Sequence, residues 1–139
     1  MAFDTIKNGI VTRLQGLGYS ESLEAVDFKN APSNEYGNTF ILKPLTGVMD
    51  NDESETLIDR FYDVQEWQAQ IAFNRSTQND VINRDDLHRK KDLILKDLDN
   101  PANWSSFARI LKYKSWEVAE FPNYFVLTIK LKIVDTYQY

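Results

Sequence analysis

Cysteine is absent from this chain, and histidine occurs only once. Without cysteine there is no disulfide framework, no thiolate metal ligand and no thiol nucleophile. No apolar run approaches the roughly 20 residues that span a bilayer. Met1 is not followed by the basic start and apolar run of a signal peptide. We therefore expect a protein without membrane partners that stays soluble in the cell that makes it.

Basic residues are outnumbered by acidic ones, 16 to 21. The 139 residues have a formal charge of −5 and a pI of about 4.9. A nucleic-acid-binding domain usually shows a basic face, so the balance argues against a specific nucleic-acid partner. The chain is long enough for one domain with a real core and too short for two.

Catalytic motifs are missing as well. His88 lies in a charged segment, and Asp92 at i+4 is a single carboxylate, which makes no metal site. The five glycines are scattered, so no phosphate-binding loop forms. Glu117 and Glu120 are candidates for paired acid–base work, but nothing in the sequence brings them together in a cleft. We predict no enzymatic activity, no catalytic residue, no cofactor and no metal.

The segment 50–55 is acidic and rich in small residues. It reads Asp-Asn-Asp-Glu-Ser-Glu, and carboxylates at alternating positions suit a calcium loop. The glycine and the closing glutamate of such a loop are missing, however. The pattern therefore favours a solvated hairpin loop that charge repulsion keeps extended.

Two segments have helical periodicity. Apolar residues from Phe3 to Leu17 recur at helical spacing, which predicts an amphipathic helix over 3–17 with Gly18 as its left-handed cap. A second helix is predicted over 83–98, with Asn83 as N-cap and Asp86 as its capping-box partner. The basic run 89–91 is flanked by aspartates and indicates a solvated helix face rather than a nucleic-acid patch. The predicted buried stripe of the second helix is Leu87, Ile94, Leu95 and Leu98.

The last segment, 123–139, alternates apolar and polar residues for longer than an average strand. We predict an inward face and, after it, a projecting aromatic tail over 135–139. Further strands are predicted over 60–74, over 39–43 with Pro44 and Gly47 ending it, and over 107–118. A short strand is possible near Val26 and Phe28. The predicted inward residues of the last strand are Phe125, Leu127, Ile129, Leu131 and Ile133.

The turn at 121–123 is short enough to join the last two strands as an antiparallel hairpin. Together these elements predict a single α+β domain over 1–139. We expect a mainly antiparallel sheet of four to five strands packed against two helices.

This layout resembles the tail terminator proteins of long-tailed bacteriophages, the lambda minor tail protein U family. The resemblance rests on 67–71 (Trp-Gln-Ala-Gln-Ile) in the central strand, on the helix over 85–98, and on 124–129 with the tail to Tyr139. It covers nearly the whole chain in layout. The loop 18–36 and the segment 100–113 depart from it by being longer.

The resemblance implies a virion protein of which six copies form a ring. Such a ring stops tail-tube polymerisation and joins the tail to the head connector. The implied partners are further copies of the chain, the tail-tube protein, and a connector or head-closure protein, with the genome passing through the ring. The implied location is the tail or neck of the virion, after assembly from the host cytoplasm.

Rings arise from heterologous contacts, in which one surface meets a different surface of the next subunit. Aromatic side chains are common at such contacts, although Trp67 suits the core. Two alternatives stay open: another neck or tail-completion ring protein, such as a head-closure or adaptor protein, and a monomeric binding module or small accessory enzyme. The predicted interface residues are Gln68, Gln70, Asp50, Asp52, Glu53, Trp104, Asp135, Tyr137 and Tyr139.

Overall fold

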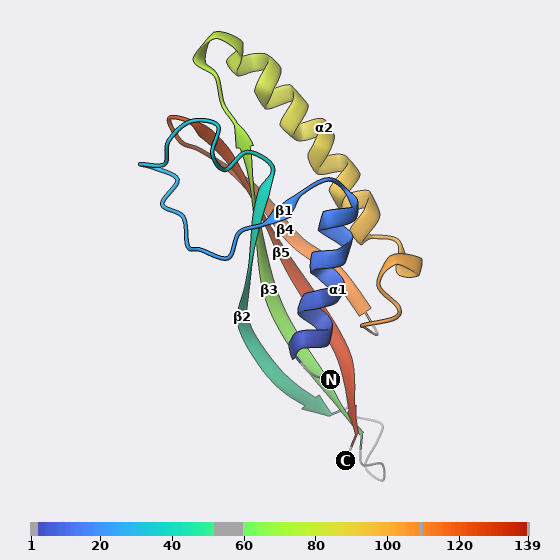
Figure 1. The fold of residues 1–139 in the computed structure, drawn as a ribbon. Coiled ribbons are helices and arrows are strands. Elements are labelled where there is room, and N and C mark those ends of the chain that lie inside the picture. Colours follow the sequence, from blue (N-terminus) through green and yellow to red (C-terminus); the bar gives the residue numbers. More distant parts are fainter. Residues whose placement is uncertain (1–2, 52–59, 109, 139) are drawn as a thin grey trace.

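The computed structural model describes residues 3–51, 60–108 and 110–138, with backbone only for 46–51, 60–63, 77 and 135–138 (Figure 1). Two α-helices, two short 3-10 turns and five strands follow one another in these residues. In chain order they are α1 (Phe3–Gly16), β1 (Ser20–Glu21), β2 (Thr39–Asn51), β3 (Arg60–Asn74), η1 (Thr77–Asn79), α2 (Asp80–Leu98), η2 (Pro101–Asn103), β4 (Ile110–Glu120) and β5 (Tyr124–Gln138).

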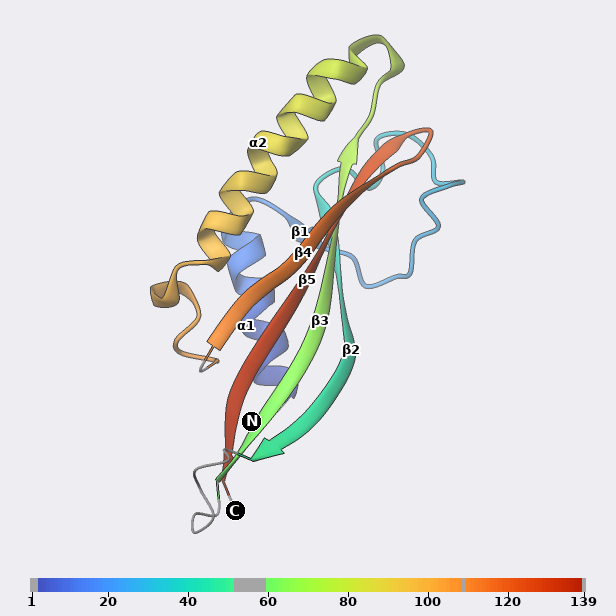
Figure 2. The same ribbon diagram turned by 180° about the vertical axis from the view of Figure 1, so that it is seen from behind.

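The five described strands form one sheet in the order β1-β2-β3-β5-β4. All neighbours pair antiparallel except β1, which runs parallel to β2 for two residues. Both helices lie on the same side of this sheet (Figure 1). In the opposite view the strands lie in front of α1 (Figure 2). The predicted α+β fold, with a mainly antiparallel sheet and two helices, is confirmed.

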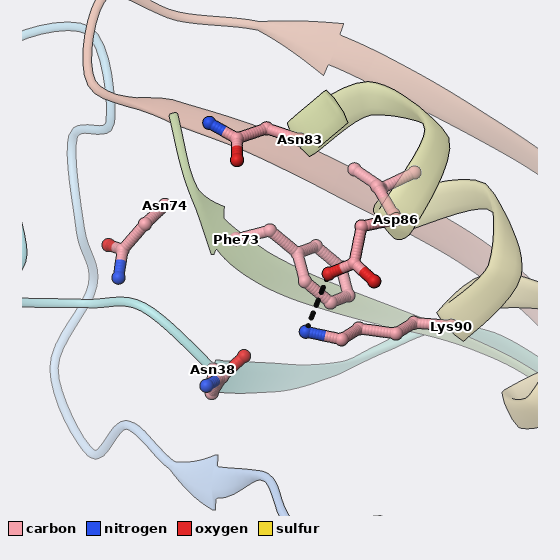
Figure 3. A pocket seen from close by; sticks show the side chains of 7 residues that line it. Asn38, Phe73, Asn74, Asn83, Asp86 and Lys90 are labelled. Atoms are coloured by element: carbon pink, nitrogen blue, oxygen red, sulfur yellow. Dashed lines mark ion pairs between the residues drawn. The ribbon is translucent and has the colours of Figure 1, made fainter. Parts of the chain in front are cut away.

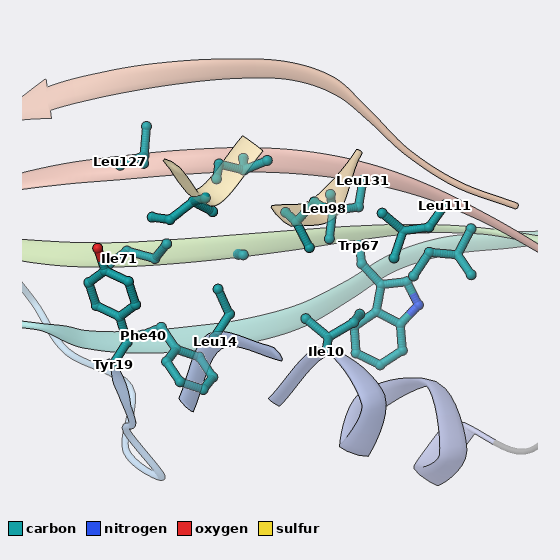
Figure 4. Close-up of a cluster of buried hydrophobic side chains, with 14 of the residues drawn as sticks. Ile10, Leu14, Tyr19, Phe40, Trp67, Ile71, Leu98, Leu111, Leu127 and Leu131 are labelled. Atoms are coloured by element: carbon teal, nitrogen blue, oxygen red, sulfur yellow. The ribbon is translucent and has the colours of Figure 1, made fainter. Parts of the chain in front are cut away.

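The core lies between this helix-covered face and the two helices (Figure 4). The predicted inward face of β5 is confirmed, since all five of its residues are fully buried. Trp67 also lies in this core, and the ring of Phe3 stacks on it at 5.2 Å. The helices contribute Ile6, Ile10 and Leu14 from α1, and Leu87, Ile94 and Leu98 from α2; the predicted Leu95 is only partly buried against them.

One ion pair joins the two helices. Arg13 on α1 donates from Nε to Asp97 Oδ1 on α2 at 3.0 Å, and its Nη2 donates to the other carboxylate oxygen. This hydrogen bonding with Asp97 raises the pKa of Arg13. A bidentate contact of this kind fixes the orientation of the two side chains as well as their distance.

The second helix begins at Asp80, one turn before the predicted start. Asn79 occupies the N-cap without a side-chain hydrogen bond, so the predicted cap at Asn83 and its capping box are wrong. Arg75, just after β3, instead donates from Nε to Asp80 Oδ1 at 2.7 Å and from Nη1 to the Phe121 carbonyl at 3.0 Å. The helix start is therefore fixed by contacts with the rest of the fold.

The strand β2 continues to Asn51, so Pro44 and Gly47 do not end it as predicted. β1 pairs with β2 only at Thr39 and Phe40, and beyond them β2 is the edge of the described sheet. An edge tolerates proline because one side of the strand has no ladder to interrupt. The register shifts between Pro44 and Thr46, which marks a bulge at the proline.

The long connection between β1 and β2 has no strand at Val26 or Phe28, in contrast to the prediction. It covers one end of the second sheet face, where Phe28 and Ala31 pack against Tyr124 and other residues of β3 and β5. The Tyr124 hydroxyl accepts hydrogen bonds from the backbone N–H groups of Glu35 and Tyr36, both at 3.0 Å. The same hydroxyl donates to the Pro32 carbonyl. This loop is thus part of the folded unit.

The hairpin of β4 and β5 is confirmed, with two differences in detail. β4 occupies 110–120 rather than 107–118, and a register shift between Tyr113 and Ser115 explains its broken alternation. The backbone of β5 pairs with β3 as far as Gln138, opposite Arg60. The segment 135–138 therefore belongs to the sheet and is not the projecting tail that the sequence predicted.

Candidate functional site

A polar pocket of about 170 Å³ lies between α2 and the end of β3 (Figure 3). Three carboxamides reach it, from Asn38, Asn74 and Asn83. Its two charged side chains pair with each other, Lys90 Nζ lying 3.0 Å from Asp86 Oδ2. The chemistry that this pocket offers is hydrogen bonding by amides around a neutralised ion pair.

His88, the single histidine, packs on β4. Its ring meets that of Trp116 edge-on at 5.7 Å, and Lys91 Nζ lies 3.9 Å from the centre of the same indole. A cation over an indole face is attracted by the ring electrons. Over residues 3–51, 60–108 and 110–138, no group of three or more histidine and acidic side chains gathers as a metal site.

Glu117 and Glu120 do not form a carboxylate pair. Glu117 lies opposite Thr128 and Glu120 opposite Phe125, and residues an odd number apart on a regular strand point to opposite faces. Glu120 Oε1 accepts from Arg84 Nη2 at 2.7 Å, which ties β4 to α2. The acid–base pairing considered from the sequence is therefore not built by this fold.

The face of the sheet away from the helices has two halves. The half near the hairpin tip is covered by the loop between β1 and β2. The other half has no described helix over it (Figure 2) and exposes five lysines, which we call the lysine face. These residues are Lys43 on β2, Lys112 and Lys114 on β4, and Lys130 and Lys132 on β5.

The strand register places these lysines in adjacent rows. In one row Lys43 lies opposite Gln68, and Gln68 lies opposite Lys130. In the next row Lys132 has Glu66 on one side and Lys112 on the other. Because directly opposite residues are about 5 Å apart, the charges form one continuous patch.

Glu66 is the acidic residue inside this patch. Its Oε1 lies 2.5 Å from Lys114 Nζ, across the β5 strand that separates them. The hydrogen bond and charge of Lys114 lower the pKa of Glu66, and the charges of Lys130 and Lys132 act in the same direction. Glu66 therefore stays ionised and neutralises only part of the lysine face.

Two of the predicted interface residues lie on this same side of the sheet. Gln68 is half-buried between Lys43 and Lys130, and Gln70 is half-buried between Ile41 and Thr128. The alternation in β3 correctly placed both on the face opposite Trp67. Their role in an interface stays a prediction.

Trp104 lies after η2, and its indole packs at the margin of the main core. Its Nε1 is buried and has no hydrogen-bond partner among the described residues. An unpaired buried N–H costs free energy. The packing of the Trp104 ring against the core anchors the loop after η2. An interface role for Trp104 remains a prediction.

The other predicted interface residues are described only in part. The backbones of Asp50, Asp135 and Tyr137 lie in strands, opposite residues 62, 63 and 61 respectively. Asp52, Glu53 and Tyr139 lie outside the described residues. The lysine face is not predicted from the sequence because its members come from three strands. Its local signals are two alternating pairs, Lys112 with Lys114 and Lys130 with Lys132.

Neither described helix is both long and apolar enough to cross a membrane. No family model matches the chain, and no curated protein matches it either.

Proposed function

We propose that this chain is a structural virion protein of a long-tailed bacteriophage. Copies of it form a ring that ends tail-tube polymerisation and joins the tail to the head connector. The tail-tube protein and a connector or head-closure protein are its partners. The ring works without a cofactor, through surface contacts alone, and the genome passes through it.

One observation carries this proposal: the order and arrangement of the elements. A first helix, two long strands, a second helix and a closing hairpin follow one another, and both helices lie on one face of the sheet. This is the layout that the resemblance to the tail terminator family implies. The segment 67–71, which contributes to the resemblance, lies in β3 at the centre of the sheet.

The charge distribution supports a role in assembly. A ring of identical subunits needs two unlike surfaces on each subunit. The exposed lysine face lies on a chain whose formal charge is −5, so unlike surfaces are available. The half-buried Gln68 and Gln70 are also consistent with a contact surface, because protein interfaces contain direct hydrogen bonds.

A tube-growth assay tests the proposal. The purified chain is added to the growing tail-tube protein of the same particle, and tube lengths are measured in electron micrographs. We expect growth to stop, with a ring of about 97 kDa, six times 16.2 kDa, at one tube end. Tubes that grow on unchanged, with the chain monomeric at micromolar concentration, would overturn the proposal and favour a binding module.

A further inference from the structure

We infer that the lysine face is the docking site for the acidic surface of a second copy of this chain. The inference rests on the proposed function, because a ring contact gives this docking its purpose. It goes beyond that function by naming the surface and the chemistry of the contact. The residues are Lys43, Lys112, Lys114, Lys130 and Lys132.

Charge is separated between the lysine face and the rest of the chain. The formal charge of the chain is −5, whereas this half-face holds five lysines and the two glutamates Glu66 and Glu117, so the rest of the chain carries −8. Opposite potentials on two surfaces of one molecule attract a second molecule head to tail. A head-to-tail contact is heterologous, which is the type that closes into rings.

Like charges repel one another within the lysine face. Lys112 on β4 lies directly opposite Lys132 on β5, and like charges in that position destabilise a sheet. Glu66 lies on the other side of Lys132 in the same row, but its carboxylate is 2.5 Å from Lys114 Nζ, so it offsets this repulsion only in part. Local conflicts that a fold retains are typical of functional surfaces. An acidic surface brought against the patch would remove the repulsion.

The position and composition of the lysine face also suit a protein partner. The lysine face lies on a sheet, beside the part that the loop between β1 and β2 covers. A polar side chain, Gln68, lies between Lys43 and Lys130 and offers both a donor and an acceptor. A hydrogen-bonding, positively charged surface suits an acidic protein surface.

Nucleic acid fits the same patch less well. The five cations are all lysines, and the patch includes Glu66, which the lysines keep ionised. The rest of the chain, at −8, would repel a polyanion extending beyond the patch.

The experiment compares the self-association of charge-reversed variants. Lys130→Glu with Lys132→Glu reverses two charges in the lysine face, and Lys29→Glu with Lys96→Glu makes the same change at exposed lysines elsewhere. Sedimentation velocity at low and high salt measures association, and thermal unfolding shows that each variant is folded. We expect the first pair to weaken association by about 10-fold or more and the second pair by much less. High salt should weaken the wild type as well.

Cross-linking provides a second readout. The chain has no cysteine, so a single introduced thiol can be labelled specifically. Ser115→Cys places one thiol on the lysine face opposite Lys130, and Ser105→Cys places one near η2. Each thiol is labelled with benzophenone maleimide and irradiated. We expect cross-linked dimers from Ser115→Cys, joined to acidic peptides of the second copy.

Different results overturn different claims. A ring that forms equally well in both charge-reversed pairs, with no cross-link from Ser115→Cys, overturns this inference and leaves the proposed function standing. A wild type that is monomeric at every concentration overturns both. Binding of a fluorescent DNA duplex that only the Lys130 and Lys132 reversal abolishes, without any change in self-association, overturns the inference in favour of nucleic acid.

Discussion

Lys112 and Lys132 lie directly opposite each other on neighbouring strands, and both are exposed. Like charges so placed repel across about 5 Å. On the other side of Lys132 lies Glu66, whose carboxylate pairs with Lys114. The sheet therefore keeps an unfavourable pair on the surface that we propose as a docking site.

Relieving this repulsion should stabilise the isolated chain. We expect Lys112→Glu, which gives Lys132 an opposite charge, to raise the Tm by about 2 °C at low salt. The gain should shrink at high salt because exposed charges are screened. Lys29→Glu is the control, and a Tm that falls in Lys112→Glu would contradict the proposed repulsion.

Tyr124 should hold the loop between β1 and β2 onto the sheet. In Tyr124→Phe the N–H groups of Glu35 and Tyr36 and the Pro32 carbonyl lose their partner. We expect the free energy of unfolding to fall by about 1–3 kcal/mol, with faster hydrogen exchange in 22–38. Tyr113→Phe, at a position 41% exposed, should change little. Equal effects in the two variants would show that the hydroxyl contacts do not matter.

The ion pair of Arg13 and Asp97 should fix α1 against α2. In Asp97→Asn the guanidinium loses its charged partner, and the Asp97 side chain is only 12% exposed. We expect a loss of about 1–2 kcal/mol in denaturant unfolding. Asp85→Asn, at an exposed position on the same helix, is the matched control. An unchanged stability in Asp97→Asn would mean that helix packing alone sets the arrangement.

The start of α2 should depend on pH through Asp80. The hydrogen bond and charge of Arg75 lower the pKa of Asp80 below its unfolded value of about 3.9. A depressed pKa stabilises the fold above the unfolded pKa, and this stabilisation disappears as the pH falls through the folded pKa. We therefore expect the wild type to lose stability on acidification below about pH 4.

Asp80→Asn isolates this contribution. The variant should be less stable than the wild type at neutral pH, and the difference should narrow as the pH falls below about 4. Urea unfolding at a series of pH values measures it. A difference that stays constant over that range would exclude Asp80 as the titrating group.

Alternation and helical period predicted much of the fold because they depend only on which residues share a face. They gave β3 with its observed bounds and the buried face of β5. The early start of α2 escaped prediction because Arg75, not a local cap, holds Asp80. The extension of β2 past Pro44 escaped because edge position depends on the neighbouring strands.

The candidate site was harder to predict for a related reason. The lysine face depends on the register of Lys43, Lys112 and Lys130 on three different strands, and residues far apart in sequence set that register. The covered end of the same face depends on Tyr124, which binds backbone groups about 90 residues earlier in the chain. Only the alternating lysines within β4 and within β5 leave a local pattern in the sequence.

An image reconstruction of the phage particle to which we propose that this chain belongs tests the central claim most directly. We predict six copies in a ring at the head-proximal end of the tail tube, with the lysine face of each copy against its neighbour. Absence of the chain from the particle, or a position away from the junction of tail and head, would contradict the account.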